Sequence, residues 1–107
     1  MSRVKFAKAK ELLTEYQNNK LLLESTNSYL KASQMDEITK KDEVTSRCLE
    51  LLKCNDPELY EIVIQRIVNK VGAVEVAIEF GFTTDTIEKK LRKGLRIFEK
   101  YLERFEI

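Results

Sequence analysis

The chain lacks the residues on which most enzyme sites depend. Its 107 residues include no histidine and no tryptophan. Histidine is the commonest general acid or base near neutral pH, so its absence removes the usual catalytic group. The three glycines stand apart, at positions 72, 81 and 94, which excludes a glycine-rich phosphate loop. We therefore predict a protein that is not an enzyme, has no catalytic residue and binds no cofactor.

Cysteine is almost as scarce, because Cys48 and Cys54 are the only two in the chain. They are six positions apart in a predicted helix, which separates their side chains by about 240° around its axis. A disulfide between them is therefore not expected. Zinc needs about four ligands, and two cysteines without histidine do not supply them. We predict that both are small apolar side chains in buried or half-buried positions, and that the chain holds no metal.

A large excess of either charge is also missing. The 19 basic and 18 acidic residues leave a formal net charge of +1, which neither favours nor excludes nucleic acid as a partner. No apolar run is as long as a membrane span, and the N-terminus lacks the apolar segment of a signal peptide. We expect a cytoplasmic protein with no membrane partner. Hydrophobic residues make up 43% of the chain, enough for one small core.

Neither glycine nor proline occurs before Pro57, so long helices are expected in the first half. Apolar residues at spacings of three and four predict a helix over residues 3–30. Its stripe contains Phe6, Ala9, Leu13, Tyr16, Leu23 and Leu30. A helix of this length exceeds what a small core requires, so it either packs on its own chain or pairs with a second copy as a homodimer. Lys20 and Asn27 interrupt the stripe, and either fix its register or face solvent.

Polar residues gather at 31–43 and predict a break between two helices. Asp36 or Thr39 would begin the second helix, which would run to Lys53. Its apolar face would contain Val44, Cys48, Leu51 and Leu52. The N-terminal half is thus predicted to be a long helix or a helical hairpin.

The clearest boundary is the sequence Asn-Asp-Pro-Glu at positions 55–58. Asn55 or Asp56 can cap a helix, Pro57 suits its first position, and Glu58 is stabilised by the positive end of the helix dipole. A helix is predicted over residues 57–71, ended by Gly72. We therefore divide the chain into an N-terminal region at residues 1–54, for dimerisation or partner binding, and a C-terminal domain at residues 55–107.

Residues 76–98 have the pattern of two helices joined by a tight turn. Ala77 is small enough for a second helix to cross closely, and Gly81 suits the positive φ of a sharp reversal. Thr83 is the predicted N-cap of the second helix. An apolar stripe follows at three and four spacing, formed by Ile87, Leu91, Leu95, Phe98 and Leu102. Helices at 57–71, 73–80 and from 84 onward would form a trihelical unit.

The sequence of residues 76–94 is VAIEFGFTTDTIEKKLRKG. It resembles the C-terminal helix-turn-helix of bacterial sigma factors and their relatives, whose usual form is closer to I-A-x-x-L-G-x-S-x-x-T-V-x-x-x-L-x-R-A. The order of a charged helical front half and this C-terminal motif is also similar to small phage late-gene regulators of the ArpU kind. The resemblance implies an all-α protein that regulates transcription by binding double-stranded DNA.

An inward-facing stripe leaves the opposite face of the second helix for DNA. The residues predicted to read bases in the major groove are Thr84, Asp85, Glu88, Lys89 and Arg92. Those predicted to bind phosphates are Thr83, Lys90, Lys93 and Arg96. From 83 to 98 there are five basic and two acidic residues, a local charge of +3. The two carboxylates would repel phosphates, although a glutamate can accept from cytosine N4.

Two functions from different classes stay open. The first is transcriptional regulation through major-groove binding, in a phage or mobile element. The second is a helical adaptor whose helix-turn-helix binds a protein, such as an RNA polymerase subunit or another regulator, in place of DNA. Gly94 adds a structural expectation: in mid-helix it costs about 1 kcal/mol relative to alanine, which indicates either close contact with a neighbour or a fraying point. The resemblance has a small residue at this position, which favours close packing.

Overall fold

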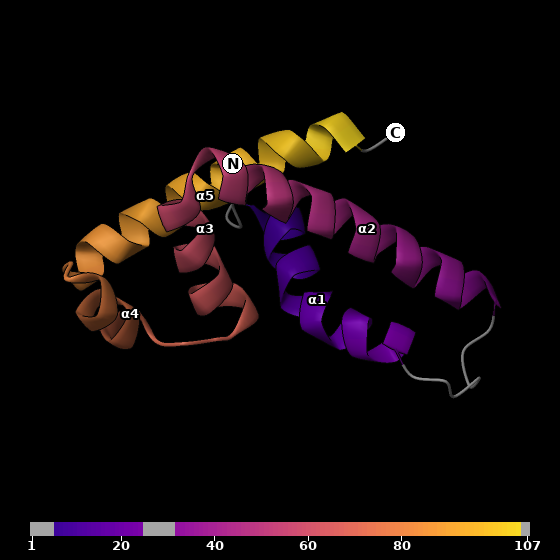
Figure 1. Ribbon diagram of the computed structural model, residues 1–107, viewed down its shortest axis with the longest axis horizontal. Helices are drawn as coiled ribbons and strands as arrows, with labels where there is room; N and C mark the ends of the chain where they lie inside the picture. Colours follow the sequence, from indigo (N-terminus) through magenta and orange to yellow (C-terminus); the bar gives the residue numbers. More distant parts are fainter. Residues whose placement is uncertain (1–5, 25–31, 106–107) are drawn as a thin grey trace.

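The computed structural model describes residues 6–24 and 32–105. Every element of regular secondary structure in these ranges is a helix (Figure 1). The elements in order are α1 Ala7–Glu24, α2 Ala32–Asn55, α3 Pro57–Val63, the π-helical turn η1 Ile64–Val68, α4 Ala73–Phe80 and α5 Thr84–Phe105. No strand occurs within the described ranges. The predicted all-α class is confirmed. None of the helices described combines the length and apolar composition that a membrane crossing needs.

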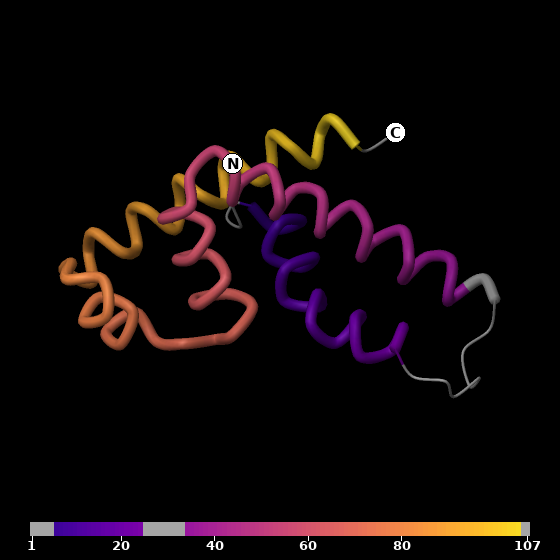
Figure 2. The backbone as a smooth tube through the Cα atoms, viewed as in Figure 1, coloured from indigo at the N-terminus to yellow at the C-terminus, as the bar shows by residue number. Residues whose placement is uncertain are grey.

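The long helices α1, α2 and α5 pack on one another, and α3 and α4 pack against the first half of α5. Figure 2 shows the chain reversing after α2 into α3, and then running through an extended segment into α4. One cluster of buried residues joins both halves of the sequence, including Leu13 of α1, Cys48 of α2 and Phe98 of α5. The residues of this core come from both sides of position 54. The division of the chain into two regions at this position stays a prediction.

Helix α1 begins later in the sequence than predicted. It begins at Ala7, after a positive φ of 60° at Phe6, and it is described as far as Glu24. Ala9 and Leu13 of the predicted stripe are fully buried within the chain's own core. Lys20 lies outside that core and pairs with Asp42 of α2 at 3.6 Å. Packing on the same chain is thus confirmed for this part of the stripe, while Asn27 and Leu30 lie outside the described residues.

The predicted break at 31–43 is wrong. Helix α2 begins at Ala32 and passes through this stretch without interruption, so neither Asp36 nor Thr39 is its first residue. The reason is that the segment contains no glycine or proline. Most of its polar side chains described from 34 to 43 face solvent, while Ile38, Lys41 and Asp42 are half-buried. A polar composition on an exposed face is compatible with a continuous helix.

The two cysteines of α2 have different environments, and both are free. Cys48 is fully buried, which confirms the prediction for this residue. Cys54 is exposed, so the prediction of a buried or half-buried side chain is wrong there. Burial raises the pKa of the Cys48 thiol to about 11, because the apolar core disfavours the thiolate.

The start of α3 was predicted correctly and its end was not. Asp56 accepts a hydrogen bond from the backbone N–H of Leu59 at 3.2 Å, with Pro57 at the first helical position. The helix then widens into η1 and ends at Val68, before the predicted Gly72. After η1 the positive φ, 59°, belongs to Lys70, while Gly72 has φ −67°. The widened turn has bonds of its own, from the N–H of Asn69 to Ile64 O and from that of Val71 to Gln65 O.

Candidate nucleic-acid interface

The turn between α4 and α5 has the backbone that the sequence predicted. Gly81 ends α4 with φ 73°, in the left-handed region. The N–H of Phe82 then bonds to Ala77 O at 2.9 Å, closing the end of the helix. Thr83 Oγ1 accepts from the backbone N–H of Thr86 at 3.1 Å, so Thr83 is the N-cap of α5. The direction in which α5 leaves the turn is therefore fixed by local interactions.

Two small residues allow the helices around α5 to approach closely. Ala77 on α4 is buried with 4% of its surface exposed. Gly94 on α5 faces α3, where an added Cβ would lie 2.7 Å from Val63 Cγ2 and 3.6 Å from Leu59 O. The predicted close contact at Gly94 is confirmed. Both residues are small because a neighbouring helix occupies the space that a larger side chain would need.

The apolar stripe of α5 faces inward as predicted. Ile87, Leu91, Leu95, Phe98 and Leu102 are all buried. The opposite face is open, and exposes most of the residues predicted to contact DNA, namely Thr83, Thr84, Asp85, Lys89, Arg92, Lys93 and Arg96. Glu88 and Lys90 are half-buried. The part of the N-terminal half that the structure describes, residues 6–24 and 32–54, does not cover the start of α5, where Thr83, Thr84 and Asp85 are exposed.

Two of the predicted DNA-binding lysines have carboxylate partners within the protein. Lys89 Nζ lies 3.3 Å from Asp85 Oδ2, one turn earlier on the exposed surface of α5. Such a surface pair is weak and is screened by salt, so a phosphate can compete for the lysine. Lys90 is held more firmly, because it donates to Glu58 Oε1 at 2.8 Å and lies over the ring of Phe82 at 5.1 Å. We expect Lys90 to stabilise the contact between α3 and α5.

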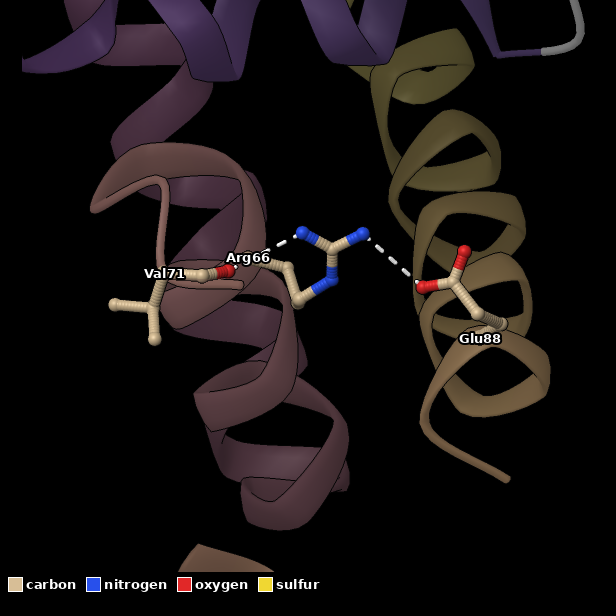
Figure 3. Close-up of polar contacts among 3 residues, drawn as sticks. All are labelled: Arg66, Val71 and Glu88. Carbon is tan, nitrogen blue, oxygen red and sulfur yellow. Dashed lines mark hydrogen bonds and ion pairs between the residues drawn. The ribbon is translucent and has the colours of Figure 1, made fainter. Parts of the chain in front are cut away.

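Glu88 is also bound within the protein, by an arginine that sequence reasoning did not single out (Figure 3). Arg66 Nη2 donates to Glu88 Oε1 at 3.1 Å, and Nη1 donates to the backbone oxygen of Val71 at 3.1 Å. The guanidinium thereby joins η1, the following loop and α5. The signal in the sequence was that Arg66 is the one basic residue in the apolar run at 57–68.

Three predicted cations are left without a partner. Arg92, Lys93 and Arg96 are exposed, and no other described residue forms an ion pair or hydrogen bond with their side chains. They follow one another at spacings of one and three, on the side of α5 opposite the buried stripe. Positive charge is thus presented to solvent by the middle turns of α5, while both carboxylates of its first turns have cationic partners.

Comparison of the chain with protein-family models, with curated proteins and with solved structures found no match. Among the described residues, no three carboxylate or cysteine side chains are grouped so that they could hold a metal ion. The geometry and charge of the α4–α5 surface are therefore the basis of the function proposed below, and the likeness of residues 76–94 to sigma-type motifs stays an expectation.

Proposed function

We propose that the protein is a DNA-binding transcriptional regulator in which α4 and α5 form a sigma-like helix-turn-helix. In this proposal α3 is the third helix of a trihelical unit, and α1 and α2 form a helical hairpin beside it. The exposed face of α5 enters the major groove. The proposal is carried by one observation: Arg92, Lys93 and Arg96 are exposed and have no ion pair with any residue of 6–24 and 32–105, on a helix whose first turns are open to solvent.

The first turns of α5 would read bases. Early turns of a recognition helix lie deepest in the major groove, which places Thr84, Asp85 and Lys89 near base edges. Arg92, one turn further on, can donate to both O6 and N7 of guanine. Glu88 remains a predicted base-reading residue, and would contact cytosine N4 only if it exchanged its bond with Arg66.

Phosphates would be bound along the flanks of the same face. Lys93 and Arg96 form no ion pair with another described residue. The Thr83 hydroxyl lies at the N-terminus of α5, and would bind a phosphate only after leaving Thr86 Oγ1, to which it donates at 2.9 Å. Lys90 would contribute only after leaving Glu58. Four or five phosphate contacts correspond to a slope of roughly −4 for the logarithm of the association constant against the logarithm of the salt concentration.

Fluorescence anisotropy with a labelled duplex of mixed sequence tests the proposal. The wild-type protein should bind the duplex at low salt. As salt is raised, the logarithm of its association constant should fall with a slope of roughly −4 against the logarithm of the salt concentration. The variant Lys89→Ala/Arg92→Ala should lose most of the binding while its circular dichroism spectrum is unchanged. Absence of binding by the wild-type protein at low salt would refute the proposal.

A second candidate function is favoured by the surface of α4. Val74 and Ile78, one turn apart, are 61% and 76% exposed. They are flanked by the exposed carboxylates of Glu75 and Glu79, which would repel DNA phosphates. The alternative is an adaptor that binds a protein, such as an RNA polymerase subunit or another regulator. In that case duplex DNA should not bind, and Val74→Ser/Ile78→Ser should abolish binding to purified polymerase.

The origin and assembly of the protein form a further part of the proposal. The likeness to phage late-gene regulators of the ArpU kind supports a role in a phage or mobile element. A homodimer through the N-terminal helix stays a prediction. Because Ala9 and Leu13 are already buried within the chain, such a dimer would have to use other residues of α1, such as Leu21, which is 62% exposed. Sedimentation equilibrium of wild-type protein and Leu21→Ser measures this directly.

A further inference from the structure

A row of four basic residues runs along α5 and extends past the positions assigned to DNA above. Arg92, Arg96, Lys100 and Arg104 occur at every fourth position, and all are exposed. Residues four apart are neighbours on one side of a helix, and this row spans about 18 Å of the helix axis. Within the described part of the chain, no hydrogen bond or ion pair occupies any of the four side chains. We call these four residues the basic row.

Two of the three acidic side chains beside the basic row, Glu88 and Glu99, are bound elsewhere in the fold, while Glu103 stays beside it. Glu88 precedes Arg92 by four positions, the spacing at which a glutamate normally pairs with a following cation. Its carboxylate is instead bound by Arg66 from η1, at 3.1 Å. Glu99 stands next to Lys100 in sequence, yet its Oε2 accepts from the backbone N–H of Ala9 at 2.8 Å. The positive end of the α1 dipole stabilises a carboxylate at this position. Of the acids in the second half of α5, Glu103 alone makes no bond with another described residue.

Such an arrangement is unfavourable for the isolated protein. Like charges four apart on a helix repel one another, so three successive pairs in the basic row lower the stability of α5. Binding a polyanion would remove this repulsion. Glu88 and Glu99 are bound elsewhere in the fold, which leaves Glu103 as the acid of α5 that can reduce this repulsion, near Lys100 and Arg104.

We propose that Lys100 and Arg104 extend the DNA-binding surface, so that the whole basic row binds one duplex. The inference rests on the proposed function. Helix α5 has 22 residues and is therefore about 33 Å long, whereas the major groove is about 12 Å wide. If the first turns lie in the groove, the last turns lie over its edge, where only phosphates are within reach. Lys100 and Arg104 then bind the backbone without reading sequence.

The test compares two variants that lose the same charges. Lys100→Ala/Arg104→Ala removes one lysine and one arginine from the end of the basic row. Lys40→Ala/Arg47→Ala removes the same pair of residue types from exposed positions of α2. Binding to a labelled mixed-sequence duplex is measured at several salt concentrations. The first variant should bind roughly tenfold or more weakly near 0.1 M salt, with a slope shallower by about 2, and the control should match the wild type.

Each outcome decides the inference. A wild-type-like slope for Lys100→Ala/Arg104→Ala would overturn it while leaving the proposed function intact. An equal loss of affinity in both variants would mean a general charge effect and would also overturn it. If the wild-type protein binds no duplex, the proposed function fails and this inference fails with it. Thermal unfolding gives a second readout: because repulsion is removed, Lys100→Ala/Arg104→Ala should unfold at the wild-type temperature or above, and loss of the fold would contradict that expectation.

Discussion

Arg66 Nη2 lies 3.1 Å from Glu88 Oε1, and this pair connects the π-helical turn η1 to the second turn of α5. The side chains are 23% and 44% exposed, so the pair is only partly screened by solvent. It anchors the proposed recognition helix to the trihelical unit. It also neutralises a carboxylate that would otherwise repel phosphates in the proposed complex with DNA.

Replacement of Arg66 by methionine tests both roles of this pair. Loss of the guanidinium should lower the free energy of unfolding by about 1 kcal/mol, since the pair is partly exposed and the Val71 oxygen also loses a donor. It should also weaken DNA binding, because the Glu88 carboxylate is released. The rescue variant is Arg66→Met/Glu88→Gln, which should recover DNA affinity but not full stability. Urea unfolding and the salt titration measure the two effects separately, and an unrescued affinity would contradict the charge argument.

Substitution of Gly94 by alanine tests the close packing of α5 on α3. The new Cβ would meet Val63 Cγ2 at 2.7 Å, which we expect to destabilise the protein by about 1–3 kcal/mol through overpacking. The gain in helix propensity, about 1 kcal/mol, offsets only part of this. Gly72→Ala is a control, since nothing lies within 4 Å of its added Cβ and its φ is −67°. In urea unfolding, Gly94→Ala should have a lower free energy of unfolding than the wild type, and Gly72→Ala should be close to the wild type. A Gly94→Ala variant at least as stable as Gly72→Ala would contradict the predicted packing.

Removal of the Thr83 hydroxyl tests the cap of α5. Thr83→Ala should lower the free energy of unfolding by about 1 kcal/mol, because the N–H of Thr86 loses its acceptor at 3.1 Å. Thr83→Ser keeps the hydroxyl and should remain within a few tenths of a kcal/mol of the wild type. Thermal unfolding of the two variants makes the comparison. Equal stability of alanine and serine at this position would show that the cap contributes little.

The two cysteines should differ in their reactivity toward iodoacetamide. The thiolate is the reactive form, and at pH 8 it is almost absent from Cys48, whose pKa is raised to about 11 by burial. Cys54 is exposed and should be alkylated first. Mass spectrometry of the native protein should show one rapid and one slow modification, and both should become rapid in denaturant. Alkylation of Cys48 at the rate of Cys54 in native protein would contradict the buried position.

The sequence specified local structure well where a residue has one physical role. Gly81, Thr83 and Asp56 mark helix ends through φ or a side-chain oxygen, and all three behave as predicted. The buried face of α5 was equally predictable, because the spacing of the apolar residues alone determines which face is buried. These are short-range effects that need no knowledge of the rest of the fold.

Features that depend on distant contacts were not predictable in the same way. The polar stretch at 31–43 suggested a break, yet residues 32–43 are continuous helix within α2, with most of their described polar side chains exposed. The turn η1 replaces the last part of a predicted helix, and its loop is held by Arg66. Arg66 and Glu88 are 22 positions apart, so their pairing depends on how α3 and α5 pack. The hydrogen bond from the backbone N–H of Ala9 to the Glu99 carboxylate likewise depends on how α1 and α5 pack.

The central claim, that the exposed face of α5 binds duplex DNA, is tested most directly by nuclear magnetic resonance. Isotope-labelled protein is titrated at low salt with a short mixed-sequence duplex, and backbone amide shifts are followed. The account predicts that the perturbed amides lie along α5 from Thr83 to Arg104, with the largest changes near Arg92 and Arg96. Unchanged spectra, or shifts confined to α4 around Val74 and Ile78, would contradict it.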